Sequence, residues 1–211
     1  MLKNAIKGFM FSKALIGKST AKKIAYIAVV TAFTVVSNAF EFKFLNVQFS
    51  LTVLISALAG LIVGAGSGFI ACFVGDLLGF LINGGGLVYM PWVGLTTAVI
   101  ALISGVVYNN LKLNCKGELA LKTLIVSVVS FLLGTILINT TGFYFYNKAM
   151  GFSTKLLEYV NQSFGGNASY FAYACYRLFF LGQIYNSIAN YALLFALSPI
   201  VLRIPFIKKA S

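Results

Sequence analysis

Residues 50–109 read SLTVLISALAGLIVGAGSGFIACFVGDLLGFLINGGGLVYMPWVGLTTAVIALISGVVYN. The apolar runs in this stretch predict three helices, at residues 50–63, 68–82 and 91–109. A glycine-rich turn at residues 64–68 and a loop at residues 83–90 separate them. Asp76 is the only acidic residue inside an apolar run, where a carboxylate is costly, so it is a candidate functional residue. We expect this stretch to organise the fold and to form one wall of a binding site.

The composition is that of a membrane protein. Of the 211 residues, 60% are hydrophobic and 9% are charged, whereas soluble domains carry about 25% charged residues. The sequence has no His and only 4 acidic residues, so neither a zinc site nor a Ser-His-Asp triad can be assembled. The three cysteines are scattered and are interpreted as packing residues. We therefore expect one all-α membrane domain that is not an enzyme and holds no metal or other cofactor.

Hydropathy divides the chain into a basic amphipathic segment at residues 1–23, a membrane domain at residues 24–203 and a basic tail at residues 204–211. A cleaved signal peptide is the alternative for the N-terminal part. Six transmembrane helices are expected, at residues 24–40, 50–63, 68–82, 91–109, 119–146 and 173–202. Residues 41–49 are expected to be a short polar break. For residues 147–169, the longest connection, we expect a half-buried lid or a short helix, because glycines alternate with aromatic residues.

The basic residues predict the orientation of the bundle. The net charge is +12, and 12 of the 16 Lys and Arg lie before residue 24, in residues 111–122 or after residue 202. Lys and Arg favour the cytoplasmic side of a membrane, so both termini are expected to be cytoplasmic. The same rule explains the positive charge without a nucleic-acid partner. We expect a multi-pass protein of the bacterial plasma membrane.

With this orientation, polar and aromatic residues converge at the outer end of the bundle. Gln183, Asn186 and Asn190 share one face of the last helix, whereas Arg177 points away from that face if the helix is regular. Amides are costly in hydrocarbon, so they should face the bundle interior or a wet cavity. The substrate-binding candidates are Asp76, Asn83, Tyr89, Trp92, Asn139, Thr140, Tyr144, Arg177, Gln183, Asn186 and Asn190.

Structural roles remain open for several of these residues. The amides could bind one another or backbone carbonyls between helices. Tyr89, Trp92 and Tyr144 could belong to the aromatic belt at the membrane interface. Asp76 could pair with a helix end or with Arg177 instead of contacting a ligand.

A row of alanines marks the first expected helix. Small residues recur on one face at Ala21, Ala25, Ala28 and Ala32. Such faces let a neighbouring helix approach closely in lipid. The spacing alone leaves open whether that neighbour is another protein or another helix of the same chain.

Taken in order, these features resemble the substrate-binding S component of an energy-coupling factor (ECF) vitamin transporter. The similar features are the basic N-terminus with its alanine pairs, ALAGLIVG at residues 57–64 and GDLLG at residues 75–79. Within that family the chain is most similar to the folate group, through GDLLG, the glycine loop with Tyr89 and Pro91, Gly94-Leu95-Thr96, and Asn139-Thr140. It departs from that group in residues 147–170.

The resemblance implies a six-helix bundle that binds a vitamin from outside and works with a coupling membrane protein and two ATPases. It also implies that the alanine face, Ala21, Ala25, Ala28 and Ala32, docks on the coupling protein. The sequence has no G-x-x-x-x-G-K-[ST] phosphate loop, so ATP hydrolysis would belong to another subunit. Two other functions stay open: a secondary transporter that uses Asp76, and a membrane scaffold subunit.

Overall fold

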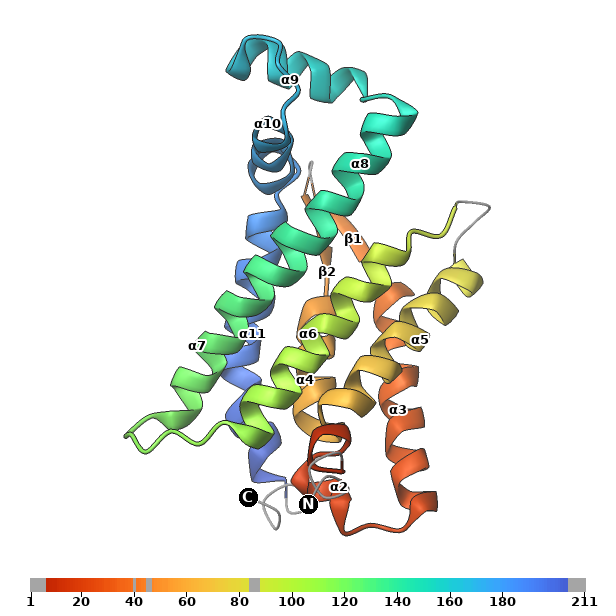
Figure 1. The fold of residues 1–211 in the computed structure, drawn as a ribbon, viewed down its shortest axis with the longest axis vertical. Coiled ribbons are helices and arrows are strands. Elements are labelled where there is room, and N and C mark those ends of the chain that lie inside the picture. Colours follow the sequence, from red (N-terminus) through yellow and green to blue (C-terminus); the bar gives the residue numbers. More distant parts are fainter. Residues whose placement is uncertain (1–6, 40, 45–46, 84–87, 205–211) are drawn as a thin grey trace.

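The computed structural model describes residues 7–39, 41–44, 47–83 and 88–204. They form a bundle of long, roughly aligned helices with a small antiparallel hairpin at its side (Figure 1). The N-terminal helix α2 and the last turn of α11 lie at the same end of this bundle (Figure 1). The chain therefore enters and leaves the bundle on one side.

The elements have the following bounds. The long unbroken helices are α3 (Thr20–Ala39), α4 (Thr52–Val63), α5 (Ala65–Asn83), α6 (Pro91–Asn110) and α11 (Gln183–Arg203). One continuous rod consists of α7 (Glu118–Ser130), the π-helix η1 (Phe131–Thr140) and α8 (Thr141–Met150). The shorter helices are α2 (Lys13–Ile16), α9 (Thr154–Phe164), α10 (Tyr170–Cys175) and the π-helix η2 (Tyr176–Phe180). In the hairpin, β1 (Glu41–Phe44) pairs with β2 (Val47–Ser50).

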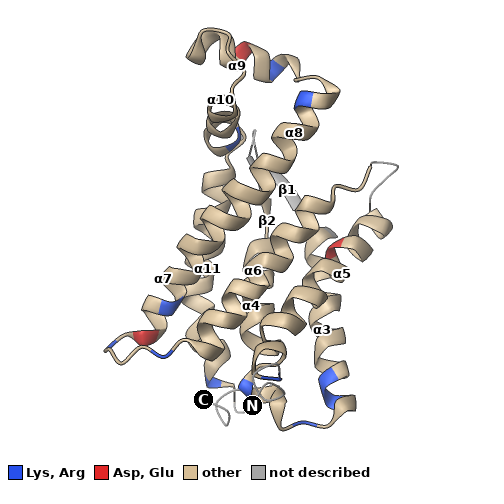
Figure 2. Ribbon diagram, in the orientation of Figure 1, with Lys and Arg blue, Asp and Glu red and all other residues tan. Residues whose placement is uncertain are grey.

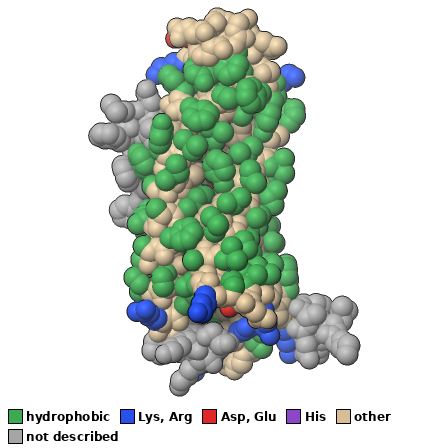
Figure 3. Space-filling model, turned by 90° about the vertical axis from the view of Figure 1, so that its left-hand side faces the viewer, with side chains coloured by type: hydrophobic (Ala, Val, Ile, Leu, Met, Phe, Trp, Pro, Cys, Tyr) green, Lys and Arg blue, Asp and Glu red, His purple; other side chains and the backbone are tan. Residues whose placement is uncertain are grey.

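The bundle has the length and the surface of a membrane protein. Within the described residues, 5 helices are long and apolar enough to cross a membrane: α3, α5, α6, the α7–η1–α8 rod and α11. α4 is apolar but shorter. Hydrophobic side chains cover the middle of the face shown in Figure 3, and Lys and Arg gather towards the ends of the bundle (Figure 2). The predicted class, a predominantly helical membrane protein, is confirmed.

Glycines bring the central helices together. A Cβ added to Gly60 of α4 would collide with the Ala101 carbonyl of α6 and lie 2.7 Å from the backbone nitrogen of Gly105. Gly64 separates α4 from α5 with a φ of 105°, a conformation that side chains with a Cβ rarely adopt. The turn between these helices is shorter than predicted, because Ala65 already begins α5.

The basic N-terminal segment is fastened to the end of the bundle. The Ser12 backbone nitrogen donates to the Val63 carbonyl at 2.9 Å, and the Ser12 hydroxyl donates to the Ile62 carbonyl at 2.7 Å. Leu15 is fully buried in the core between α3, α4 and α5. These contacts satisfy carbonyls at the last turn of α4 that have no partner inside that helix. Residues 12–15 are therefore part of the packed fold.

The structure differs from the sequence-based expectations in two further places. Residues 41–44 and 47–50 form two paired antiparallel strands instead of a polar break. The prediction of one continuous helix at residues 173–202 is wrong. η2 ends at Phe180, and Gly182, with a φ of 69°, interrupts the helix before α11 begins. The short helix expected within residues 147–169 is confirmed as α9. The glycine triplet at 84–86 and all but the first residue of the basic tail lie outside the described residues.

Candidate solute-binding site

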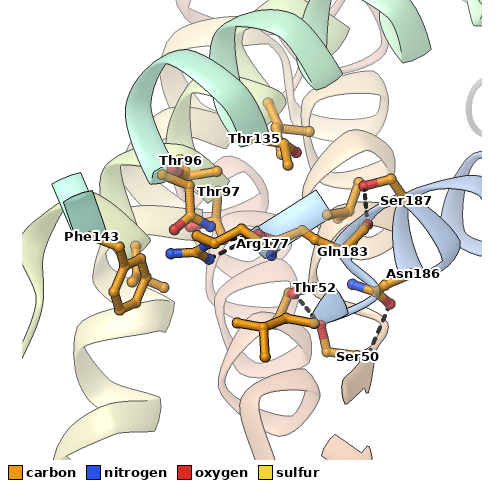
Figure 4. Close-up of a pocket in the computed structure, with 15 residues that line it drawn as sticks. Ser50, Thr52, Thr96, Thr97, Thr135, Phe143, Arg177, Gln183, Asn186 and Ser187 are labelled. Carbon is orange, nitrogen blue, oxygen red and sulfur yellow. Dashed lines mark hydrogen bonds between the residues drawn. The ribbon is translucent and has the colours of Figure 1, made fainter. Parts of the chain in front are cut away.

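A cavity of about 240 Å³ lies inside the bundle where α4, α6 and α11 begin (Figure 4). Because these helices run away from it towards the chain termini, the cavity is in the opposite half of the molecule (Figure 1). Hydroxyl, amide and apolar side chains share its wall: Ser50, Thr52, Val53, Val93, Thr96, Thr97, Ile100, Thr135, Asn139, Phe143, Arg177, Leu181, Gln183, Asn186 and Ser187.

The helix break at Gly182 places Arg177, the one cationic residue among the described residues of this wall, against Gln183. The Arg177 Nη2 and Nε atoms donate to Gln183 Oε1 at 2.8 and 3.2 Å (Figure 4). The guanidinium carbon lies 4.1 Å from the centre of the Phe143 ring, a cation–π geometry. The expectation that Arg177 points away from Gln183 is therefore wrong, because it assumed one regular helix across residues 177–190.

Asn186 and Asn190 tie α11 to the start of α4. Asn190 Oδ1 accepts a hydrogen bond from the Leu54 backbone nitrogen at 3.0 Å, and its Nδ2 donates to the Ser50 carbonyl at 2.8 Å. Asn186 Oδ1 accepts from the Ser50 backbone nitrogen at 3.1 Å. Backbone N–H groups in the first turn of a helix have no partner within the helix, so Asn190 supplies one for α4. Asn186 lines the cavity, whereas Asn190 lies behind it.

Asn139 faces the cavity from the π-helical segment of the long rod. Its Oδ1 atom is buried and has no hydrogen-bond partner among the described residues. The neighbouring Thr140 is fully buried, and its hydroxyl donates to the Thr135 carbonyl at 2.9 Å. Thr140 therefore stabilises η1 and does not line the cavity. An unpaired buried acceptor costs free energy, so a small rotation of the Asn139 amide towards a donor of a molecule bound in the cavity would be favourable.

A family model described as the S component of an ECF-type riboflavin transporter matches residues 18–175. The chain belongs to this family. Among solved structures, the crystal structure of FolT bound with folic acid is similar, with 25% sequence identity over 83% of this chain and 93% of that chain and a TM-score of 0.49. The comparison with curated proteins gives no match.

The resemblance to an ECF S component predicted from the sequence is confirmed. The family is a substrate-binding component of a vitamin transporter and not a family of enzymes. The two comparisons name different vitamins, riboflavin in the family description and folic acid in the solved structure.

Asp76 of this S component does not line the cavity itself; it lies in a neighbouring polar cluster that shares Thr52 and Thr97 with the cavity wall. Its carboxylate accepts hydrogen bonds from the Tyr89 hydroxyl at 3.1 Å and from Asn38 Nδ2 at 3.3 Å. Burial and the charge of Asp76 raise the pKa of the Tyr89 phenol to about 12, so Tyr89 keeps its proton and donates it. Asp76, inside α5, therefore joins this helix to the end of α3 and to the segment before α6. Asn83, the last residue of α5, is exposed and does not line the cavity.

The predicted aromatic residues Trp92 and Tyr144 of the S component lie outside the cavity wall. Trp92 packs edge-on against Phe143 with ring centres 5.7 Å apart, and its indole nitrogen is buried without a partner among the described residues. Tyr144 belongs to an aromatic cluster with Tyr170 and Tyr173, whose ring centres lie 5.4 and 5.5 Å from its own. Neither Trp92 nor Tyr144 lines the cavity.

Of the predicted binding residues, the cavity brings together Asn139, Arg177, Gln183 and Asn186. Sequence reasoning missed the hydroxyl side chains of Thr96, Thr97 and Thr135. The adjacent pair Thr96 and Thr97, shortly after Pro91, could have indicated the first two, whereas no pattern in the sequence indicates Thr135. Serine and threonine are common in membrane helices, because they can donate to a carbonyl of their own helix, as Thr96 does to Trp92.

The alanine face of the S component is open on the outside of the bundle. Ala21, Ala25, Ala28 and Ala32 are all exposed on α3. The side of α3 that packs on α5 instead contains Val30 and Thr34, which are buried. The alternative that this alanine face packs against another described helix of the same chain is therefore excluded.

Proposed function

We propose that this S component captures a water-soluble vitamin, folate-like or riboflavin-like, from outside the cell and delivers it through a complex with a coupling membrane protein and two ATPases. The observation that carries the proposal is the cavity, where Asn139, Arg177, Gln183 and Asn186 meet at one depth of the bundle. A pocket with few, convergent polar groups among apolar ones is typical of small-molecule sites.

The distribution of charge supports an outward-facing cavity. The described parts of the three basic segments, residues 7–23, 111–122 and 203–204, lie at the end of the bundle that holds α2 and the last turn of α11 (Figure 2). By the positive-inside rule this end is cytoplasmic. With α4 counted as a short crossing, six spans place both termini there and the cavity towards the outer face of the bacterial plasma membrane.

The exposed alanine face of α3 supports docking on the coupling protein. Ala21, Ala25, Ala28 and Ala32 leave a shallow surface against which a partner helix can pack closely. The chain has no phosphate-binding loop, so the energy would come from ATPases bound to the coupling protein.

Three features of the wall suit a heterocyclic vitamin. Asn139 Oδ1 offers an acceptor without a partner among the described residues to a ring N–H group. Arg177 offers donors to a carbonyl or carboxylate oxygen. Phe143 supplies an aromatic surface beside both. Flavin and pterin rings both carry adjacent N–H and carbonyl groups, so this wall suits either.

The proposal is tested on the full-length protein purified in detergent. Mass spectrometry of the small molecules that copurify with it should find a vitamin. Trp92 is the only tryptophan of the chain and packs against Phe143 of the wall, so riboflavin or folic acid should quench its fluorescence saturably. Asn139→Ala should weaken the quenching, and Asn110→Ala, a change at an exposed end of α6, should not. No copurified vitamin and no saturable quenching by either compound would refute the proposal.

A further inference from the structure

Arg177 is a buried charge whose protein partners are neutral. It is 8% exposed and its guanidinium lies against the Gln183 amide oxygen, the Phe143 ring and the Tyr173 hydroxyl. Among the described residues, none of those that line the cavity is acidic. Burying a cation without a counter-ion is costly, and charged residues inside membrane bundles normally find a partner of opposite charge.

Gln183 holds this guanidinium in one orientation. One oxygen, Gln183 Oε1, accepts from both Nε and Nη2 of Arg177, so it fixes the plane of the guanidinium. The contact exists because Gly182 takes a positive φ and places Gln183 at the first position of α11. A guanidinium carries more N–H groups than these contacts use, so donors remain for a bound molecule.

We infer that Gln183 sets the charge preference of the site: it positions Arg177 without neutralising it, so the cavity selects a solute with an anionic group, a carboxylate or a phosphate. This inference rests on the proposed function and narrows its ligand class. A glutamate in the same place would accept the same hydrogen bonds and also cancel the charge. The amide provides the geometry and leaves the counter-ion to the ligand.

The test compares ligands that differ only in charge. The pairs are riboflavin 5′-phosphate with riboflavin, and folic acid with its uncharged bis-amide, and the readout is quenching of Trp92. Because a charge-assisted hydrogen bond is about twice as strong as a neutral one, the anionic member of at least one pair should bind tighter by about tenfold or more.

The variant Gln183→Glu should remove most of this difference by weakening the anionic ligand and sparing the uncharged one. Gln162→Glu makes the same chemical change on the exposed face of α9 and should leave the difference as in the wild type. Arg177→Met should act in the same direction as Gln183→Glu. If it unfolds the protein, Gln183→Glu decides the question alone, and gel filtration and apparent Tm verify that this variant is folded.

Each outcome separates the two proposals. If the uncharged member of both pairs binds as tightly as the anionic one, or if Gln183→Glu preserves the wild-type difference, the inference is overturned while the proposed function stands. If none of the four compounds binds and no vitamin copurifies, the proposed function fails, and the inference fails with it.

Discussion

Replacing the two asparagines Asn190 and Asn139 by leucine should have opposite effects on stability. Asn190 is 2% exposed and serves the backbone of its neighbours, accepting from the Leu54 nitrogen and donating to the Ser50 carbonyl. Asn139 has a buried oxygen without a partner among the described residues. Asn190 therefore stabilises the protein without ligand, whereas Asn139 is proposed to form its hydrogen bond only with a bound ligand.

The magnitude follows from the groups that each change leaves behind. Asn190→Leu leaves one N–H and one carbonyl inside the bundle without their partner, at about 1–3 kcal/mol each, so unfolding should become easier by roughly 2–6 kcal/mol. Asn139→Leu removes a buried acceptor that has no partner, so the empty protein should be unchanged or more stable by up to about 1–3 kcal/mol. The vitamin should then add little further stability, because its affinity is lowered and a ligand stabilises a protein by RT ln(1 + [L]/Kd).

The assay is thermal unfolding of detergent-solubilised protein with and without the vitamin that copurifies. Asn190→Leu should lower the apparent Tm of the empty protein and keep a clear rise on addition of vitamin. Asn139→Leu should keep the Tm of the empty protein and lose most of the rise. Asn110→Leu, at an exposed end of α6, should change neither. Equal losses of Tm in the empty Asn190 and Asn139 variants would contradict the distinction between a structural and a ligand-binding amide.

Three further substitutions test other parts of the structure. Ala28→Trp should abolish uptake by the complete transporter while vitamin binding in detergent stays intact, since only the exposed face of α3 is filled. Ala192→Trp, at an exposed position of α11, is the control. Loss of vitamin binding in Ala28→Trp would contradict a docking role. Asp76→Asn should lower the free energy of unfolding by about 1 kcal/mol, because its hydrogen bonds to Tyr89 and Asn38 become weaker, and should leave the vitamin affinity unchanged. A large fall in affinity would mean that Asp76 takes part in vitamin binding. Gly182→Val should cost about 1–2 kcal/mol or more, because Gly182 has a φ of 69°, and should weaken binding by displacing Arg177 from Gln183. Gly17→Val, where the φ is −83° and no atom crowds the position, should do neither.

The helices of this protein could be predicted well from hydropathy, because long apolar runs have few alternatives in a membrane. The rod that begins at Glu118 and the helix that begins at Pro91 follow directly from such runs and from the position of proline. The break at Gly182 could not be predicted, because glycine is common inside membrane helices and no proline or polar run accompanies it.

The candidate site was predicted only in part, because the unpredicted break at Gly182 also changes which side chains meet. Gln183 and Asn186 share a helical face, and that face does line the cavity. Arg177 could be placed against Gln183 only once the break between them was known. Asp76 was the most conspicuous residue of the sequence, yet its partners Asn38 and Tyr89 come from other segments, and no local pattern reveals such a pairing.

The π-helical segments η1 and η2 give the cavity an adjustable geometry. η1 supplies Asn139 and η2 supplies Arg177, so two proposed ligand contacts stand on segments with a wider hydrogen-bonded turn than an α-helix. Deleting one residue from η1 would turn every later position of the rod by about 100°. Phe143 would then leave the wall, and a different side chain would take its place. Single-residue insertions and deletions at these two segments are therefore a route by which relatives of one bundle can come to recognise different vitamins.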